Sequence, residues 1–444
     1  LSVQRERAVL VKVLAGKPNS DSYDPLAELR LLAKAAGAIV VDGLTQRLNR
    51  VNPKTYIGKG KTAELGERVR AGGANLIIFD NDLSPAQIRE LERQVECKIL
   101  DRSELILDIF ASRARTHEAK LQVELAQLEY TAPRLRGMWT HLERIAGAGG
   151  GSAVGAVGGI GTRGPGEKQI EIDRRIVRDR VAALRRELSH IERRKIQTVR
   201  SRSDCFTVSL VGYTNSGKST LLNALTDAGA YTADKLFATL DTKTVRWEID
   251  ECCTVLLSDT VGFVRDLPHR LVASFRATLE EAMHANLLLH VIDASNPRAA
   301  QQVAAVGELL DELGCTDVPT VALLNKIDAV QDEADVRLVE SFFDQAYRIS
   351  ALTGEGLDQV VDAVRRAASS NALAVTLRMP AGDGRALAAV DNDARVLDRR
   401  YVQDVVELDV VIDRRHLDRL LGQHDTLEVV STNGPSQAAA ETDA

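Results

Sequence analysis

The stretch GYTNSGKST (212–220) could bind a phosphate, because it follows the spacing G-x-x-x-x-G-K-[ST]. The apolar stretch FTVSLV precedes it and the helix-like TLLNAL overlaps its end, which is the strand–loop–helix context that the motif requires. Backbone N–H groups in such a loop point at a phosphate at the helix start. Lys218 is expected to bridge the β- and γ-phosphates, and Ser219 to hold Mg²⁺. The predicted contacts are Gly212, Tyr213, Thr214, Asn215, Ser216, Gly217, Lys218, Ser219 and Thr220.

Two further motifs at strand ends concern the metal and the terminal phosphate. DTVG (259–262) ends the apolar run TVLLS, so Asp259 can hold Mg²⁺ through water and the Gly262 N–H can sense the γ-phosphate. FATLDT (237–242) lies between the two motifs, and Thr239 is the best candidate to complete the Mg²⁺ shell, with Thr242 and Thr244 competing. The predicted contacts here are Phe237, Ala238, Thr239, Leu240, Asp241, Asp259, Thr260, Val261 and Gly262. The predicted metal ligands are Ser219, Thr239 and Asp259, and the predicted catalytic groups are Lys218, Thr239 and Gly262.

The motifs NKID (325–328) and SAL (350–352) indicate that the base is guanine. Asp328 can accept hydrogen bonds from guanine N1–H and N2–H₂, which adenine does not offer in that arrangement. Asn325 would face N7, Lys326 would cover the ring, and SAL can offer a backbone N–H to O6. The predicted base contacts are Asn325, Lys326, Ile327, Asp328, Ser350, Ala351 and Leu352. Four motifs in this order, each at a strand end, predict an enzyme that binds and hydrolyses GTP with Mg²⁺.

Two positions in these motifs are unusual. Phe263 follows DTVG, where many GTP hydrolases carry a Gln that positions the attacking water, and a hydrocarbon ring cannot orient water. This predicts an enzyme that is slow alone and depends on groups from a partner, while the simpler alternative is that Phe263 only packs the segment. Asn215 either shapes the phosphate loop or helps to ligate a monovalent cation such as K⁺.

The elements that must position these motifs predict a multidomain α/β protein. Residues 1–110 alternate strand-like and helix-like stretches, which indicates an N-terminal α/β domain with a parallel sheet. Residues 204–370 alternate again and form the P-loop domain. A small C-terminal α+β domain follows at 371–431, with 384–400 read as helix, and the polar 432–444 is expected to be a disordered tail.

Between the two α/β regions, residues 111–203 predict a long antiparallel helical hairpin. Residues 102–146 read as helix former with a break at Pro133, and residues 166–200 form a second helix. The glycine-rich 146–166 would be the tip loop. The expected seam comprises Leu121, Leu125, Leu128, Leu135, Leu142 and Ile145 on the first helix and Ile170, Val177, Val181, Leu184, Leu188 and Ile191 on the second.

Composition restricts the partners. The chain of 444 residues has a net charge of −6, yet 111–203 holds 19 Lys/Arg against 10 Asp/Glu, a net +9. A basic segment in an acidic protein indicates a polyanion-facing element, although a solvated helical surface gives the same pattern. The sequence contains no run of 18 apolar residues, so no membrane-spanning helix is expected. Five cysteines without a C-x-x-C pair favour a reducing compartment and argue against a disulfide frame or a zinc site.

The motifs together resemble a known group. GYTNSGKSTLLNAL, FATLD, DTVGF and NKID resemble the Obg–HflX group of translation-factor-related GTPases. RSELILDIFASRARTHEAKLQVELAQLEYTAPRLRG (102–137), GGIGTRGPGEKQIEIDRRIVRDRV (158–181) and NDLSPAQIRELE (81–92) resemble the HflX family specifically. The resemblance covers about residues 20–370.

This resemblance implies a monomeric cytoplasmic protein that binds the large ribosomal subunit. Its hydrolysis of GTP would be stimulated there, the hairpin tip would reach ribosomal RNA near the peptidyl-transferase centre, and the protein would split stalled ribosomes under stress. The tip departs from the family pattern, because AGAGGGSAVGAV adds residues ahead of GGIG. An alternative function is nucleotide-gated assembly of the large subunit. The stretch YIGKGKTAEL (56–65) has two possible interpretations: a second nucleotide site, or a glycine-rich turn that faces RNA or solvent.

Overall fold

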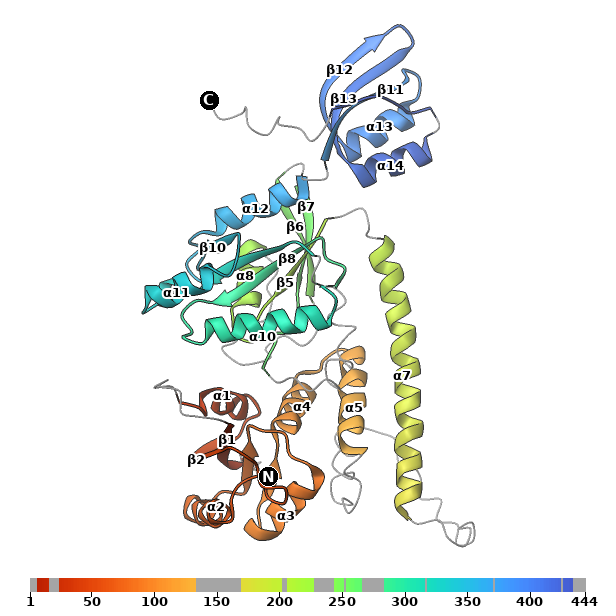
Figure 1. Ribbon diagram of the computed structural model, residues 1–444. Coiled ribbons are helices and arrows are strands. Elements are labelled where there is room, and N and C mark those ends of the chain that lie inside the picture. Colours follow the sequence, from red (N-terminus) through yellow and green to blue (C-terminus); the bar gives the residue numbers. More distant parts are fainter. Residues whose placement is uncertain are drawn as a thin grey trace, which may run out of the picture. The chain divides into compact units, whose positions relative to one another are not determined.

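A computed structural model describes residues 6–15, 24–132, 169–201, 206–226, 243–250, 253–265, 283–315, 318–369, 372–424 and 426–433 (Figure 1). The chain divides into two compact units. The first holds the described residues up to Lys195 together with Val264 and Arg265, and the second holds the rest. No helix in the described ranges is long and apolar enough to cross a membrane.

The first unit begins with a parallel four-stranded sheet in the order β2-β1-β3-β4. Its elements are β1 (Arg7–Ala15), α1 (Ala27–Ala35), β2 (Ile39–Leu48), α2 (Lys59–Gly72), β3 (Leu76–Phe79), α3 (Pro85–Val95) and β4 (Lys98–Leu100). The central strand β3, LIIF, is buried along its whole length, as expected when helices cover both faces of a parallel sheet. Ser84 and Gln87 form a capping box that starts α3.

Two helices, α4 (Arg102–Arg113) and α5 (His117–Thr131), follow the sheet. The expectation of an unbroken helix from 102 to the region of Pro133 is wrong, because α4 ends at Arg113 with extended backbone at Ala114. Thr116 then caps α5 by accepting a hydrogen bond from the Ala119 amide at 3.1 Å. Ala114, Arg115 and Thr116 therefore separate two helices that periodicity alone would join.

The third long helix, α7 (Gln169–Ser201), packs on α5 through the predicted seam. Leu121, Leu125 and Leu128 of α5 form one buried cluster with Val177 and Leu184 of α7. His117 at the start of α5 pairs with Glu187 at 3.0 Å, and Glu124, seven residues further along α5, pairs with Arg180, seven residues earlier on α7, at 2.7 Å. The two helices are therefore antiparallel. The expected seam positions Leu135, Leu142 and Ile145, the side chain of Ile170 and the tip loop lie outside the described residues.

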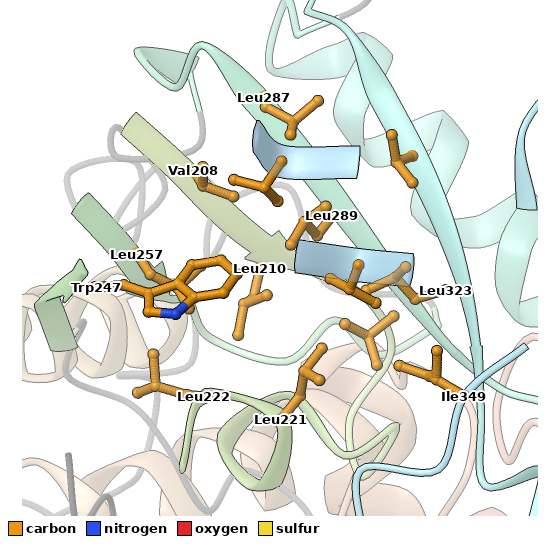
Figure 2. Close-up of a cluster of buried hydrophobic side chains, with 14 of the residues drawn as sticks. Val208, Leu210, Leu221, Leu222, Trp247, Leu257, Leu287, Leu289, Leu323 and Ile349 are labelled. Atoms are coloured by element: carbon orange, nitrogen blue, oxygen red, sulfur yellow. The ribbon is translucent and has the colours of Figure 1, made fainter. Parts of the chain in front are cut away.

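The second unit contains a six-stranded sheet in the order β10-β9-β8-β5-β7-β6, in which only β6 is antiparallel to its neighbour. Its elements are β5 (Phe206–Val211), α8 (Lys218–Leu225), β6 (Lys243–Asp250), β7 (Cys253–Asp259), β8 (Leu287–Asp293), α10 (Ala299–Glu312), β9 (Thr320–Asn325), the 3₁₀ turn η2 (Ile327–Ala329), α11 (Glu333–Glu340), β10 (Ala346–Arg348) and α12 (Leu357–Ser369). Figure 2 shows the core, where strand residues such as Leu210, Leu289 and Leu323 meet Leu221 of α8. This packing fixes the strand ends that carry the motifs.

A small antiparallel sheet with two helices completes the second unit. Its elements are β11 (Ala372–Pro380), α13 (Gly384–Asp393), β12 (Arg395–Val402), β13 (Val405–Asp413), α14 (Arg414–Gln423) and β14 (Glu428–Asn433), with strand order β12-β13-β11-β14. The expectation of helix over 384–400 is wrong beyond Asp393, because Arg395–Val402 pairs with β13 as an edge strand. An edge strand exposed on both faces shows no apolar alternation, so its pattern is hidden. The multidomain α/β class predicted from sequence is confirmed.

Candidate nucleotide-binding site

The loop between β5 and α8 has a backbone that only glycine can adopt at two positions. Gly212 has φ of +148°, and a Cβ there would lie 2.2 Å from the Val291 carbonyl oxygen. Gly217 has φ of +98°, and its Cβ would lie 2.3 Å from Asn325 Nδ2. Asn215 between them has φ of +63°. The loop therefore curls tightly at the carboxyl end of a buried strand and ends at the N-terminus of α8, which is the geometry of a phosphate cradle.

Lys218 is buried beneath this loop, with 6% of the residue exposed. Its Nζ donates to the carbonyl oxygens of Gly212 at 3.0 Å and Tyr213 at 2.9 Å. The pKa of Lys218 is lowered to about 8, mainly by burial and to a smaller extent by the charge of Lys326, while Asp259 opposes the shift. The partners of this buried ammonium are mostly neutral carbonyl groups. A negatively charged phosphate that binds beside it would therefore form a strong ion pair with it.

Several oxygen atoms that could bind a metal ion or a phosphate group lie beside Lys218. Ser219 Oγ donates to Asp259 Oδ2 at 2.5 Å, so the two predicted metal ligands lie together. The hydroxyls of Thr214 and Ser216 are buried and, among the described residues, have no hydrogen-bond partner. Buried hydroxyls without partners are costly and indicate a ligand that satisfies them. Hydroxyl and carboxylate oxygens are the donor set that Mg²⁺ prefers, so these residues fit the metal.

The loops after β9 and β10 form the edge where the base was predicted to bind. Asn325 is buried and ties two loops together, since its Nδ2 donates to the Ser216 carbonyl at 2.8 Å and its Oδ1 accepts from the Ala351 amide at 2.9 Å. Asp328 Oδ1 accepts from Ser350 Oγ at 2.6 Å. Leu352 beside them is 80% exposed.

Sequence reasoning missed Asp293, the last residue of β8. Its Oδ2 accepts from Lys326 Nζ at 2.6 Å, and the same ammonium donates to the Asn215 carbonyl at 2.8 Å. This contact fixes the lysine over the edge of the site. The signal available in the sequence was the position of Asp293 at the carboxyl end of a strand, where polar groups of parallel sheets gather.

The segment after β7 packs directly on the phosphate loop. Phe263 is 3% exposed, and its backbone pairs with the loop: its amide donates to the Gly212 carbonyl at 3.1 Å and its carbonyl accepts from the Thr214 amide at 2.6 Å. Thr260 is buried and its hydroxyl donates to the Leu210 carbonyl at 2.7 Å. The predicted residues Phe237, Ala238, Thr239, Leu240 and Asp241 lie outside the described residues. The structure thus gathers 212–220, 259–262, 325–328 and 350–352 at one edge of the sheet.

The fold and this edge define a P-loop GTPase, an enzyme that binds guanine nucleotide and hydrolyses GTP. Residues 23–111 match the family described as "GTP-binding GTPase N-terminal", residues 113–202 "GTP-binding GTPase Middle Region", and residues 207–326 "50S ribosome-binding GTPase". The chain is 45% identical to GTPase HflX of Escherichia coli K12 over 383 residues, covering 86% of this chain and 87% of that protein. It is 41% identical to GTPase HflX of Magnetococcus marinus, covering 94% and 95%. The chain therefore belongs to the GTPase HflX family.

Among solved structures, the chain is similar to a GTP-binding protein from Sulfolobus solfataricus in complex with GDP. The sequence identity is 24%, the TM-score is 0.42, and the match covers 82% of this chain and 99% of that one.

Proposed function

We propose that GTP binds with Mg²⁺ at the loops that follow β5, β7, β9 and β10. Lys218 contacts the β- and γ-phosphates, Ser219 and Asp259 hold Mg²⁺, and Gly262 senses the γ-phosphate through its amide. Thr239 completes the metal shell. The support is the shared edge of the sheet and the buried hydroxyls of the phosphate loop. Mg²⁺ would neutralise the charge that develops on the phosphoryl oxygens.

Guanine selectivity is assigned to Asp328, held by Ser350. Asp328→Asn should lower GTP affinity by about two orders of magnitude and favour xanthosine triphosphate, because the amide presents a donor where guanine also presents one. Competition binding of GTP and xanthosine triphosphate measures this. Asp335→Asn on α11 is the matched control and should bind GTP as the parent protein does. Unchanged guanine selectivity in Asp328→Asn would remove the residue from base recognition.

We further propose that the chain acts in the cytoplasm as a monomer that binds the large ribosomal subunit and splits stalled or stressed ribosomes. The observation that carries this is Phe263. Its buried ring and paired backbone leave no polar group at the position where a hydrolase would orient water. Hydrolysis should then depend on groups from a partner, which can supply about 10⁵-fold in rate.

The hairpin supplies the surface for an RNA-rich partner, with its glycine-rich tip proposed to reach ribosomal RNA near the peptidyl-transferase centre. Basic side chains such as Arg178 and Arg186 are exposed on α7, and 111–203 carries a net +9. Contacts from arginine to phosphate give sequence-independent affinity that falls with salt. The family description of residues 207–326 names 50S ribosome binding.

The test is GTP turnover with and without large ribosomal subunits. Turnover should rise by orders of magnitude on addition of subunits, and Arg178→Glu with Arg186→Glu should weaken subunit binding, most clearly at low salt, because fewer counterions are released. The matched control swaps a pair, Glu124→Arg with Arg180→Glu, which keeps both the net charge and the ion pair. Fast turnover of the protein alone would contradict dependence on a partner.

The competing proposal is that the protein assists assembly of the large subunit. In that role it would bind the subunit with GTP and hydrolyse GTP only to be released, and the same nucleotide site would serve both functions. Two assays separate these functions: one measures splitting of intact ribosomes, and the other measures binding to precursors of the large subunit. A protein that binds precursors and leaves intact ribosomes unsplit is an assembly factor.

A further inference from the structure

Asp293 ends β8 at the nucleotide-binding edge, and both oxygens of its carboxylate accept hydrogen bonds. Its Oδ2 accepts from Lys326 Nζ at 2.6 Å. Its Oδ1 accepts from the amide and the hydroxyl of Ser295, at 3.1 and 2.6 Å. The side chain of Asp293 is 14% exposed and that of Lys326 is 31% exposed. Ser295 therefore orients the carboxylate, and the carboxylate in turn holds the ammonium of Lys326.

The same ammonium reaches the phosphate loop. Lys326 Nζ donates to the carbonyl oxygen of Asn215 at 2.8 Å. Asn325 Nδ2, from the preceding residue, donates to the carbonyl oxygen of Ser216 at 2.8 Å. Two consecutive residues of the motif NKID thus hold two consecutive carbonyl groups of the phosphate loop. These two hydrogen bonds join the loop that is proposed to bind guanine to the loop that is proposed to bind phosphate.

The two links differ in how they are held in place. Asn325 has a short side chain, is 2% exposed, and is also fixed by the Ala351 amide, which donates to its Oδ1 at 2.9 Å. Lys326 carries its charge on a flexible four-carbon stem, and a partly exposed ammonium of this kind keeps one position only when a counter-charge holds it. Asp293 supplies that counter-charge.

The backbone at the Lys326 link also needs support. Lys326 has φ of +65° and Asn215 has φ of +63°. The left-handed region is unfavourable for residues other than glycine, and such residues stay there only when their surroundings hold them. The bond between Lys326 and Asn215 joins two such positions, so its loss should loosen both loops.

We propose that Asp293 is a positioning residue for nucleotide binding: it acts through Lys326 and holds the two loops in their binding arrangement before the nucleotide arrives. A nucleotide that binds to loops already in place loses less free energy to their ordering. The base and the first two phosphates are common to GDP and GTP, so Asp293 strengthens the binding of both and leaves the chemical step unchanged. The proposal rests on the nucleotide site proposed above.

Asp293→Asn in the full chain tests this with little change of shape. The amide oxygen still accepts from Ser295, whereas the NH₂ group in place of Oδ2 cannot accept from an ammonium. The dissociation constants of GDP and of a non-hydrolysable GTP analogue should both rise about three- to thirtyfold, as expected for a charge-assisted hydrogen bond that is partly exposed. In steady-state turnover, KM should rise while kcat stays within about twofold.

A double-mutant cycle shows whether the effect passes through Lys326. Lys326→Met keeps most of the stem, removes the ammonium, and should weaken both nucleotides. Adding Asp293→Asn to Lys326→Met should cause no further loss, because the ammonium that Asp293 positions is already gone. Additive losses would show that Asp293 only supports the fold and would overturn the proposal.

The matched control is Asp250→Asn. Asp250 also ends a strand of this sheet, β6, and pairs with a basic side chain, Arg365, at 3.1 Å. Its neighbour in the sheet is Cys253 at the start of β7, so this pair lies at the opposite end of the strands from the nucleotide site. Both dissociation constants and KM should equal those of the parent protein.

A second variant serves if Asp293→Asn does not fold. Ser295→Ala keeps the carboxylate and removes one of the bonds that orient it, so both dissociation constants should rise by a smaller factor, about twofold. Parental dissociation constants in the folded variants would overturn the proposal. A fall in kcat with KM unchanged would also overturn it, because Asp293 would then act in the chemical step.

Failure of the nucleotide site itself is distinguishable from failure of this proposal. If the site is wrong, Lys218→Ala and Lys326→Met both bind GDP and the GTP analogue as the parent protein does. If the site is right and Asp293 has no positioning role, these two variants are impaired and Asp293→Asn alone keeps the parental constants.

Discussion

The parallel four-stranded sheet and the mainly parallel six-stranded sheet of this chain differ in how the polar groups at the carboxyl ends of their strands are paired. At the edge of β5, β7, β9 and β10, the hydroxyls of Thr214 and Ser216 are buried and have no partner within the described part of the chain, and Lys218 bonds backbone carbonyls. At the edge of β1, β3 and β4, the buried carboxylate of Asp80 faces the counter-charges of Lys12 and Arg102.

The difference shows that the sheet topology creates a possible ligand-binding site at the carboxyl ends of the strands. The side chains at that edge determine whether a ligand can bind there. Parallel sheets bind ligands outside the carboxyl ends of their strands. The first sheet fills that place with its own ion pairs. The candidate second site at 56–65 follows the same rule, because the Gly58 amide donates to Gln46 Oε1 at 3.1 Å and Lys61 pairs with Glu64 at 2.7 Å. These internal bonds favour a structural turn there.

The largest expected effect is the loss of Lys218. Lys218→Ala should lower GTP turnover by about two to three orders of magnitude, because a buried cation aimed at the developing phosphate charge is removed. Lys61→Ala, the equivalent change at the start of α2, should leave turnover within about twofold because Lys61 pairs with Glu64 on the surface. Steady-state phosphate release measures both. A larger loss in Lys61→Ala would reverse the comparison between the two edges.

The second effect concerns the filled edge. Asp80→Asn should lower the free energy of unfolding by about 3–5 kcal/mol, because Lys12 and Arg102 stay buried without their shared counter-charge. The exposed counterpart Asp42→Asn, which weakens the pair with Arg68, should change stability far less. Urea unfolding followed by circular dichroism compares the two variants. Equal losses would show that burial of these ion pairs has no energetic consequence.

The third effect follows from the pKa of Lys218, which burial lowers to about 8. Below pH 8 the free protein already carries the ammonium that phosphate prefers. Above pH 8 the free protein must take up a proton on binding, so nucleotide affinity should weaken toward tenfold per pH unit. Fluorescent GDP titrations between about pH 7 and 9.5 test this sign. Lys218→Arg should give a flat profile, and a flat profile in the parent protein would contradict the assignment.

The smallest effect concerns Asn215, whose positive φ fits a loop-forming role. If Asn215 also ligates a monovalent cation, turnover should be a few fold faster in K⁺ than in Na⁺ at equal ionic strength, since the cation adds charge beside the phosphates. Asn215→Ala should erase that difference. Equal turnover in the two salts would leave Asn215 with its loop-forming role alone.

Sequence patterns predicted the features that depend on local order. Lys218, Asp259, Asp328 and Ser350 were each placed at a strand end by an apolar run followed by a short motif, and the structure brings them to one edge. The seam of Leu121, Leu125 and Leu128 was equally visible, because helical spacing is a local property.

The features that escaped prediction depend on distant partners. Strand β12 forms only because β13 pairs with it, so its own charged sequence resembled helix. Arg102 stood in a helix-forming run, and nothing local connects it to Arg265, 163 residues away. The role of Asp293 depends on Lys326, which directly follows the neighbouring strand β9. Burial of a charge is decided by the tertiary fold, which periodicity does not report.

Strand β12 has one more consequence, for the behaviour of the protein at high concentration. It is the outermost strand of its sheet, with Leu397, Tyr401 and Val402 each at least half exposed, and its outer backbone edge, which pairs with no strand among the described residues, offers a template for another chain. Arg399 and Arg400, paired to Asp391 and Asp409, break up that apolar surface. These arginines act as gatekeepers against edge-to-edge polymerisation, so replacing both with threonine should increase aggregation, measured by light scattering at high protein concentration.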